Sequence, residues 1–493
     1  MKKQLLHTTP ATRFRAFALA LLAILLPLAA SAAGFGGETC GPYTYIIIDD
    51  TEAVITHFDD SEHVGDLVIT NSLGNKPVTT INNWAFSDCA NITAITIPNT
   101  VASIGDWAFQ GCTSLATITI PDSVTAIGDW AFQYCNALAA VTIPSSVDTI
   151  GTQAFVPCPS LTNITVAAGN GTYADIHGVL CDSSRTTLLA CPNGRSGAYA
   201  VPAGITAIAE EAFAACTFLT TISIHGGVST IGAAAFDFCN ALTSIDVAES
   251  NANYASRDGV LFNKGLTTLI QYPNGRPGAY AIPDGVTAIG DWAFHYSALL
   301  TAVTLPDTIT SIAQSAFAEC TALASVSIPG SVTSIEDSAF MNCGALAAIT
   351  IPGSVTDIGH RAFYNCGSLA SVLFTGNRPT GCVSTAFDGA SPTIYYLPGT
   401  TGWKATFCGR PTALWNAAFS TTAPPQIDDE GAFALSVTGN VGIPVCIEVC
   451  NSLATPDWIV LTNTTLSADG ALDYTDPDAA TLPARFYRFT FPH

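Results

Sequence analysis

Residues 115–135 read Leu-Ala-Thr-Ile-Thr-Ile-Pro-Asp-Ser-Val-Thr-Ala-Ile-Gly-Asp-Trp-Ala-Phe-Gln-Tyr-Cys, and variants of this unit recur along most of the 493-residue chain. Ile118 and Ile120 alternate with Thr119, and this period of two predicts a strand with the isoleucines inside and the threonine outside. Pro121 has no N–H to donate, so it ends the strand and begins a turn.

The second half of the unit returns to the interior. Val124 and Ile127 supply apolar side chains, and Gly128-Asp129 then predicts a turn and an N-cap. We expect a short helix or turn to follow, with Phe132 closing the unit.

The closing Ala-Phe pair sets the period, which is mostly 23 residues. A short fixed period predicts a solenoid, in which each unit buries its apolar face only against its neighbours. Eleven such pairs end at Phe86, Phe109, Phe132, Phe155, Phe213, Phe236, Phe294, Phe317, Phe340, Phe363 and Phe387.

The Ile-Pro, Ile-Gly-Asp and Ala-Phe-x-x-Cys signatures resemble the BspA-like leucine-rich repeat family over nearly all of residues 43–415. The resemblance implies a right-handed, α/β-type but mainly β solenoid with short helices or turns. Relatives of this family are associated with adhesion and with host or matrix interaction, so it also implies a binding role.

Two 58-residue gaps in the Phe series equal one 23-residue unit plus a 35-residue insert. The inserts, at about 172–200 and 253–281, are copies of one another offset by 81 residues. In the first copy, the β-rich runs 179–181 and 187–189 flank Asp182-Ser-Ser-Arg185, which predicts a hairpin projecting from the stack. Such hairpin units also occur in the family that the chain resembles.

The ends of the chain differ from the repeats. Basic residues before an apolar run over 16–30, followed by Ser31-Ala-Ala33, predict a secretory signal peptide over 1–33. The run is shorter than the ~20 residues that span a bilayer, and we expect no transmembrane segment in the mature chain. Further boundaries are a capping unit at 34–83, the solenoid at 84–419, a linker at 420–430 and a small β-sandwich-like domain at 431–493.

Charge excludes one class of partner. Only 11% of residues are charged, and 38 acidic side chains outnumber 16 Lys and Arg for a net charge of −22. An acidic surface repels phosphate backbones and anionic lipid, so nucleic acid is not an expected partner. We expect an extracellular protein or glycan ligand.

Cysteines form two patterns among the 16 in the chain. Cys181 and Cys191 correspond, at offset 81, to Phe262 and Tyr272, and this paired exchange makes Cys181–Cys191 the candidate disulfide, with two free thiols as the alternative. The other pattern is a ladder three residues after the closing Phe. We expect it to hold buried free thiols rather than cross-links or metal, because Ser297 and Ala390 also occupy this position. The ladder comprises Cys89, Cys112, Cys135, Cys158, Cys216, Cys239, Cys320, Cys343 and Cys366.

Catalytic signatures are absent from the sequence. It contains no His-Glu-x-x-His, Gly-x-Ser-x-Gly or Cys-x-x-Cys motif, so we expect no enzyme activity, no cofactor and no metal site. The acidic stretch 49–62 lacks the spaced Asp/Asn-Gly loop of a calcium site, and a solvated hairpin is the simpler interpretation.

The outward positions of the strands form the candidate binding face. Together with a parallel column of small residues, they predict a flat, nearly uncharged surface of hydroxyls and methyls. Three alternatives stay open: a structural spacer with no solenoid ligand, whose C-terminal module attaches it; ice or crystal-surface binding; and, least favoured, a secreted enzyme. The candidate residues are Thr96, Thr119, Thr142, Thr165, Ser223, Thr304, Ser327 and Thr350, with Asp246 interrupting their column.

Overall fold

The computed structural model describes residues 37–419 continuously, and 425–427, 433–439, 443–454, 457–467, 469–476, 478–479 and 484–491 beyond them. The predicted signal peptide over 1–33 lies outside the described residues, as does most of the predicted linker over 420–430.

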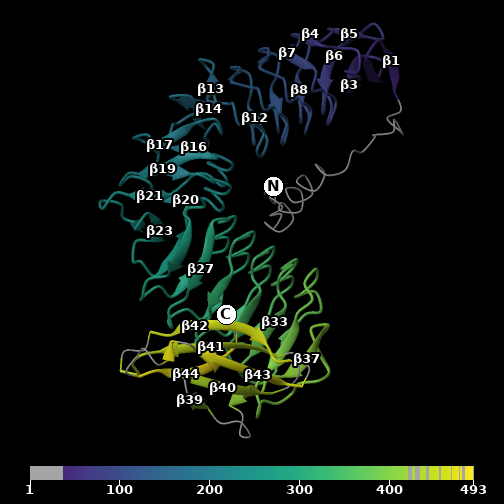
Figure 1. Ribbon diagram of the computed structural model, residues 1–493. Coiled ribbons are helices and arrows are strands. Elements are labelled where there is room, and N and C mark those ends of the chain that lie inside the picture. The colour runs from purple at the N-terminus through teal and green to yellow at the C-terminus, as the bar shows by residue number, and fades with distance from the viewer. Residues whose placement is uncertain are drawn as a thin grey trace.

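The chain forms a curved stack of coils, and each regular coil contributes two short strands (Figure 1). The first, which we call the outer strand, carries the Ile-Thr-Ile pattern, and it pairs in parallel with the outer strand of a neighbouring coil. The outer strands are β4 (Gly65–Val68), β7 (Ile92–Thr96), β9 (Thr117–Thr119), β11 (Ala140–Ile143), β13 (Asn163–Val166), β17 (Ser196–Ala200), β19 (Phe218–Ile224), β21 (Ser244–Val247), β25 (Gly278–Ala281), β27 (Leu300–Thr304), β29 (Ser325–Ser327), β31 (Ala348–Ile351), β33 (Ser371–Phe374) and β35 (Thr393–Tyr396).

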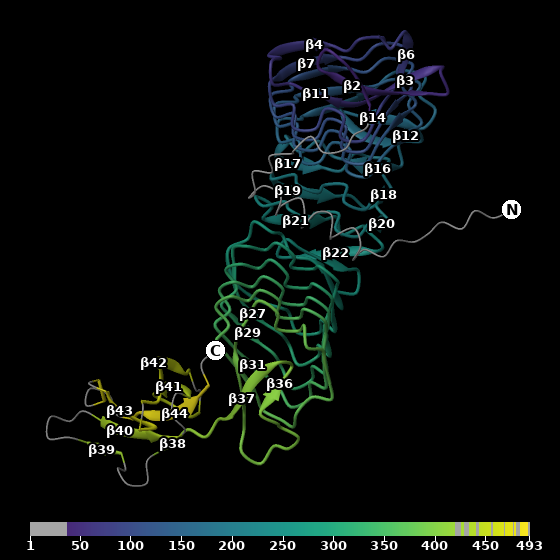
Figure 2. The same ribbon diagram turned by 90° about the vertical axis from the view of Figure 1, so that its right-hand side faces the viewer.

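The second strand of each coil follows the proline turn and also pairs in parallel between coils. Figure 2 shows the two sets along opposite edges of the stack, with β17, β19 and β21 on one side and β16, β18 and β20 on the other. The second strands are β6 (Lys76–Ile81), β8 (Ser103–Ile104), β10 (Ala126–Ile127), β12 (Thr149–Ile150), β16 (Thr187–Ala190), β18 (Ala207–Ile208), β20 (Thr230–Ile231), β24 (Thr268–Gln271), β26 (Ala288–Ile289), β28 (Ser311–Ile312), β30 (Ser334–Ile335), β32 (Asp357–Ile358) and β34 (Gly381–Cys382).

The segment that closes each coil consists of turns, so the predicted short helix is wrong; the described part of the chain contains no α-helix. A helix needs its N–H groups for bonds within the segment. Here alternate N–H groups donate to the next coil, as Trp107 N does to Asp129 O at 2.9 Å and Phe109 N to Ala131 O at 2.8 Å. The Asp129 carboxylate likewise accepts from the next coil, from Thr152 N at 2.6 Å, instead of capping its own segment.

The core runs through the stack as ladders of identical side chains. Phe109 lies between Phe86 and Phe132 with ring centroids 5.2 and 5.3 Å apart, and the same stacking joins Phe317, Phe340 and Phe363. Stacked coils of equal length place equal side chains opposite each other, so one repeat sequence suffices to pack the whole interior.

Each insert adds an antiparallel hairpin that returns to the stack. In the first, β14 (Tyr173–Ile176) pairs with β15 (Val179–Asp182), and β15 pairs with β16. β16 then joins β18 in parallel, so the hairpin continues the second sheet. The second copy repeats this order with β22 (Tyr254–Arg257), β23 (Val260–Asn263) and β24.

Antiparallel strands form the N-terminal end of the stack. β2 (Tyr43–Ile48) pairs with β1 (Glu38–Cys40) and with β3 (Glu52–Phe58), while β5 (Ser72–Leu73) pairs with β6.

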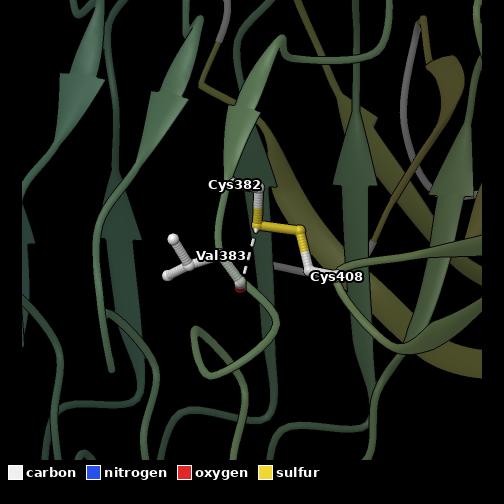
Figure 3. Close-up of a disulfide and its surroundings, with 3 residues drawn as sticks. All are labelled: Cys382, Val383 and Cys408. Carbon is white, nitrogen blue, oxygen red and sulfur yellow. Dashed lines mark hydrogen bonds between the residues drawn. A yellow bond between two sulfur atoms is a disulfide. The ribbon is translucent and has the colours of Figure 1, made fainter.

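At the other end of the stack, the last coil ends in β36 (Thr406–Phe407) and β37 (Arg410–Leu414). A disulfide between Cys382 and Cys408, with Cα atoms 6.0 Å apart, links this end to β34 (Figure 3).

The C-terminal residues form two antiparallel sheets. Their apolar core includes Leu373 and Tyr395 of the solenoid, so the prediction of a separate sandwich-like domain over 431–493 is not supported. One sheet contains β38 (Ala418–Phe419), β39 (Gln426–Ile427), β40 (Phe433–Thr438) and β43 (Ala471–Asp476), and the other β41 (Pro444–Cys450), β42 (Ile459–Thr465) and β44 (Phe486–Thr490).

Candidate binding face

The predicted hydroxyl column lies on one face of the outer strands. Thr96 pairs with Thr119, and Thr304 with Ser327, so side chains one repeat apart are cross-strand neighbours. Cross-strand neighbours on one face lie about 5 Å apart. The column therefore forms rows of neighbouring hydroxyls within each group of paired outer strands, and Ala200 and Ala281 occupy its positions on the strands that follow the inserts.

Most of the column is exposed, as the alternation of Ile and Thr predicts. Thr165 and Thr350 are half-buried, whereas the remaining candidates are exposed, namely Thr96, Thr119, Thr142, Ser223, Thr304 and Ser327. A hydroxyl can donate and accept, so the exposed row offers hydrogen bonds of both kinds without a net charge.

Some hydroxyls already bond within the face. Thr142 Oγ1 and Thr165 Oγ1 lie 2.9 Å apart, and Thr165 Oγ1 also donates to Val141 O at 3.4 Å. Ser244 Oγ donates to Asp246 Oδ1 at 2.5 Å, so the one carboxylate in the column is partly satisfied locally. The bonds of Thr165 join β11 and β13, whereas the Ser244–Asp246 bond lies within β21.

The column changes chemistry at its C-terminal end. Thr350 pairs with Leu373 and Leu373 with Tyr395, so hydroxyls give way to large apolar groups. These apolar groups are buried beneath the C-terminal sheets, where Phe491 contacts the Tyr395 ring at 5.9 Å. Figure 2 shows the C-terminal strands on the side of the stack that carries β31 and β37. The open part of the face therefore ends near Thr350.

The cysteine ladder lies in the interior, where its members are free, buried thiols. Seven of the nine thiols donate to the closing Phe carbonyl of the preceding coil, as Cys112 Sγ does to Phe86 O at 3.1 Å. Cys89 donates to Phe58 O, and Cys216 donates to Cys191 O at 3.6 Å. Burial raises the pKa of Cys158 and Cys366 to about 12. The expectation of small buried side chains was confirmed, but it missed this donor role, in which thiol and carbonyl lie 26 residues apart in the regular coils.

The predicted Cys181–Cys191 disulfide is not formed, and both residues are free thiols. Cys181 pairs with Leu188, and a shift of register between Leu180 and Cys181 displaces the partner strand. Cys191 follows the end of β16 and bonds to the next coil, from its N–H to Ala212 O at 2.7 Å. The offset of 81 correctly linked the two positions but did not make them cross-strand partners.

Three tryptophans form a ladder on the closing segments, in which Trp84 is exposed and Trp107 and Trp130 are half-buried. Trp107 stacks on Trp84 at 4.6 Å and on Trp130 at 4.9 Å, with interplanar angles of 10° and 11°. All three have positive φ, between 52° and 64°. The three rings pack on each other, and Trp84 keeps 43% of its surface exposed.

A buried polar pair at the second insert was also missed. His295 Nδ1 lies 2.9 Å from Asp237 Oδ2, and both side chains are almost fully buried. The equivalent positions in the first copy are the apolar Val156 and Ala214, which pack together. Aligning the two inserts at an offset of 81 residues shows this exchange of an apolar pair for a polar pair, so a comparison of all positions in the sequence would have found it.

Metal and membrane sites find no support in the described ranges. These contain no group of three or more His, Cys, Asp or Glu side chains suited to a metal ion, the acidic stretch at 49–62 included. No helix among the described residues is long and apolar enough to cross a membrane.

Known proteins share the repeat. The model of the BspA type leucine rich repeat region matches in six copies over residues 64–175, 197–265 and 279–390. A leucine rich cell surface protein from Faecalibacterium prausnitzii is 32% identical, covering 73% of this chain and 94% of that one, with a TM-score of 0.47. The pneumococcal vaccine antigen PcpA is 23% identical over 72% of this chain and 85% of its own, with a TM-score of 0.41. No curated protein sequence matches significantly.

Proposed function

The chain belongs to the BspA-type leucine-rich repeat family, and from that premise we propose that it is an exported surface or extracellular binding protein. Its outer strands between β7 and β31 contact an extended protein or glycan partner. Repeat solenoids of this kind are typically binding scaffolds rather than enzymes, and the matching family model is not that of a catalytic family.

The observation that carries the proposal is the exposed, in-register hydroxyl column. A flat row of hydroxyls without net charge suits a partner rich in hydrogen-bonding groups, which glycans and extended peptides both are. The acidic net charge of −22 disfavours anionic polymers, so a neutral or basic partner is favoured.

Binding of the full chain to extracellular matrix proteins, glycans and host cells tests the proposal. Thr119→Lys with Thr142→Lys places two bulky charges in the column, and we expect a saturable signal to fall at least tenfold. Thr149→Lys with Thr230→Lys is the matched control, because these exposed threonines lie on the opposite strands β12 and β20. Equal binding by both variants would contradict a role for the outer face.

A structural spacer is the second candidate function. It is favoured by the composition of the column, which lacks the Trp, Tyr and Arg that dominate binding hot spots. On this alternative the C-terminal sheets attach the chain and the solenoid sets a distance. Binding that survives substitution of the outer face but is lost on substitution of the exposed Ile459 in β42 would support it.

A further inference from the structure

The two inserts differ sharply where they rejoin the stack. At the first junction the structure contains a cavity of about 360 Å³, lined by residues of β12, the following turn, β16 and the coil after the insert. Its apolar wall includes Phe155, Leu180 and Leu189, and Cys191 also lines it. A volume of this size falls in the range of small-molecule sites.

Large side chains occupy the equivalent positions of the second copy. At offset 81, Cys191 corresponds to Tyr272 and Glu211 to Trp292. Tyr272 is 1% exposed and stacks on Phe294 with a centroid distance of 5.0 Å, and Trp292 is 9% exposed. The same architecture is therefore filled by two aromatic rings in one copy and left open in the other.

Phe-to-Phe stacking stops at both inserts, but only the second copy has an aromatic ring at the intervening closing position. Phe155 stacks on Phe132 at 5.2 Å, and Phe213 stacks on Phe236 at 5.5 Å. The coil of β13 and β16 lies between Phe155 and Phe213, and Cys191 stands at its closing position, where its N–H donates to Ala212 O as the closing Phe N–H groups do. The second copy has Tyr272 at this position, stacked on Phe294. The cavity lies at this interruption, so an apolar or aromatic group bound there would meet an aromatic wall.

The mouth of the cavity is polar and acidic. Glu210 is exposed, and Gln153 and Glu211 are half-buried. Gln153 Oε1 accepts a hydrogen bond from Trp130 Nε1 at 3.3 Å, so the cavity adjoins the end of the tryptophan ladder. Two carboxylates at the rim of an apolar hollow favour a ligand with a buried apolar body and a cationic end.

We propose that this cavity binds a small amphiphilic cation, with its aromatic or aliphatic body against Phe155 and its amine or guanidinium group at Glu210 and Glu211. The site is distinct from the hydroxyl column, and it does not depend on the outer face having a partner. It distinguishes the first insert from the second, although both have the same fold.

Calorimetric titration of the full chain with 2-phenylethylamine tests the proposal. The neutral 2-phenylethanol and the anionic 3-phenylpropionate are the matched probes. We expect one saturable site for the amine and at least tenfold weaker binding of the anion. Equal binding of amine and anion, or no binding of the amine, would overturn it.

Variants locate the site. Cys191→Tyr installs the residue that the second copy tolerates, and we expect it to weaken amine binding at least tenfold. Ala190→Gln, which installs the equivalent of Gln271, serves the same purpose if the first variant does not fold. Glu210→Gln with Glu211→Gln is expected to weaken the amine at least threefold and to leave the alcohol unchanged.

Tyr272→Cys in the second copy is the control that leaves the first cavity intact. Its affinity for the amine is expected to equal that of the unmodified chain. Undiminished amine binding by folded Cys191→Tyr and Ala190→Gln proteins would place the ligand elsewhere and refute the site.

Discussion

The ladder cysteines illustrate how one residue type meets two demands in a narrow interior. The position admits only a small side chain, and it also faces a carbonyl of the preceding coil that accepts a second hydrogen bond besides its backbone one. Cys366 Sγ fulfils both demands, because it is fully buried and lies 3.0 Å from Phe340 O. A thiolate would lose that donor and the solvation of its charge, which is why burial raises the pKa of these thiols.

Stability should therefore fall in alkaline solution. A thiol ionises near pH 8.5 in the unfolded chain, whereas the pKa of Cys158 and Cys366 is about 12 in the fold. Above roughly pH 9 the native state binds more protons than the unfolded state, so the free energy of unfolding decreases with pH up to about 12, by at most about 1.4 kcal/mol per pH unit for each thiol. Urea denaturation of the reduced protein between pH 7.5 and 11 measures this slope. A Cys158→Ser protein should show a shallower slope, and an identical one would contradict the account.

Backbone strain recurs at the residue before the Ala-Phe pair. At ten of the eleven pairs this residue has positive φ, as in Trp107 at 53°, Ala234 at 51° and Ser338 at 57°. Left-handed backbone costs roughly 1–2 kcal/mol for a residue with a Cβ. The tryptophans offset this cost by stacking, but Ala234 has no side chain that could do so.

Ala234→Gly is expected to stabilise the protein by roughly 1 kcal/mol, because glycine adopts positive φ without steric cost. Ala233→Gly is the matched control at an exposed neighbour without positive φ, where glycine should be neutral or destabilising by roughly 0.5–1 kcal/mol. Chemical denaturation of the two variants compares them directly, and the reverse order of stability would be incompatible with strain at this position.

At the scale of elements, the closing segment shows why a local pattern failed. The Gly-Asp pair resembles a helix start, yet Gly128 is there for a close approach: a Cβ on it would lie 2.5 Å from Gly105 C of the preceding coil. The turn therefore continues into hydrogen bonds between coils. The periodicity of the sequence predicts where the closing segment begins. Hydrogen bonds to the neighbouring coil then determine that it forms turns and not a helix.

The terminal disulfide secures the last element of the stack. It closes a loop of 26 residues, and a cross-link of that span stabilises by roughly 3 kcal/mol. Cys408→Ser should lower the free energy of unfolding by about that amount. Dithiothreitol should reproduce the loss in the unmodified chain and have little effect on the variant.

Thiol counting provides an independent check on the same element. The denatured, unreduced protein should yield 14 free thiols, because Cys382 and Cys408 are the paired ones. A count of 12 would instead show a second disulfide, for which Cys181–Cys191 is the candidate.

At the scale of the whole molecule, the C-terminal sheets act as a cover for the outer face. They bury Leu373 and Tyr395, and Trp415 Nε1 donates to Pro444 O at 2.9 Å across the same contact. Without this cover, Leu373 and Tyr395 would lie on an exposed apolar sheet face at the end of the stack. Exposed apolar faces favour association with other chains. With these apolar residues covered, the hydroxyl column is the accessible part of the outer strands.

Leu373→Asp should loosen this cover, because it buries a charge without a partner. We expect faster hydrogen exchange in β41 and β44 with little change in the coils before β27. Thr304→Asp is the control on the same column, where the side chain is exposed and no exchange difference is expected. Protection of β41 and β44 that does not change in Leu373→Asp would show that the sheets are held by other contacts.

The sequence by itself determined the repeat, the outward hydroxyl column and the equivalence of the two inserts, because Ile118, Thr119 and Phe132 follow periods that a short segment already contains. Only the tertiary structure decided that the closing segments are turns, that Cys382 pairs with Cys408, that Leu373 lies under the C-terminal sheets and that the first junction is hollow. These features depend on which groups of distant segments meet, and a hydrogen bond, a disulfide or a cavity exists only once the coils are stacked against one another.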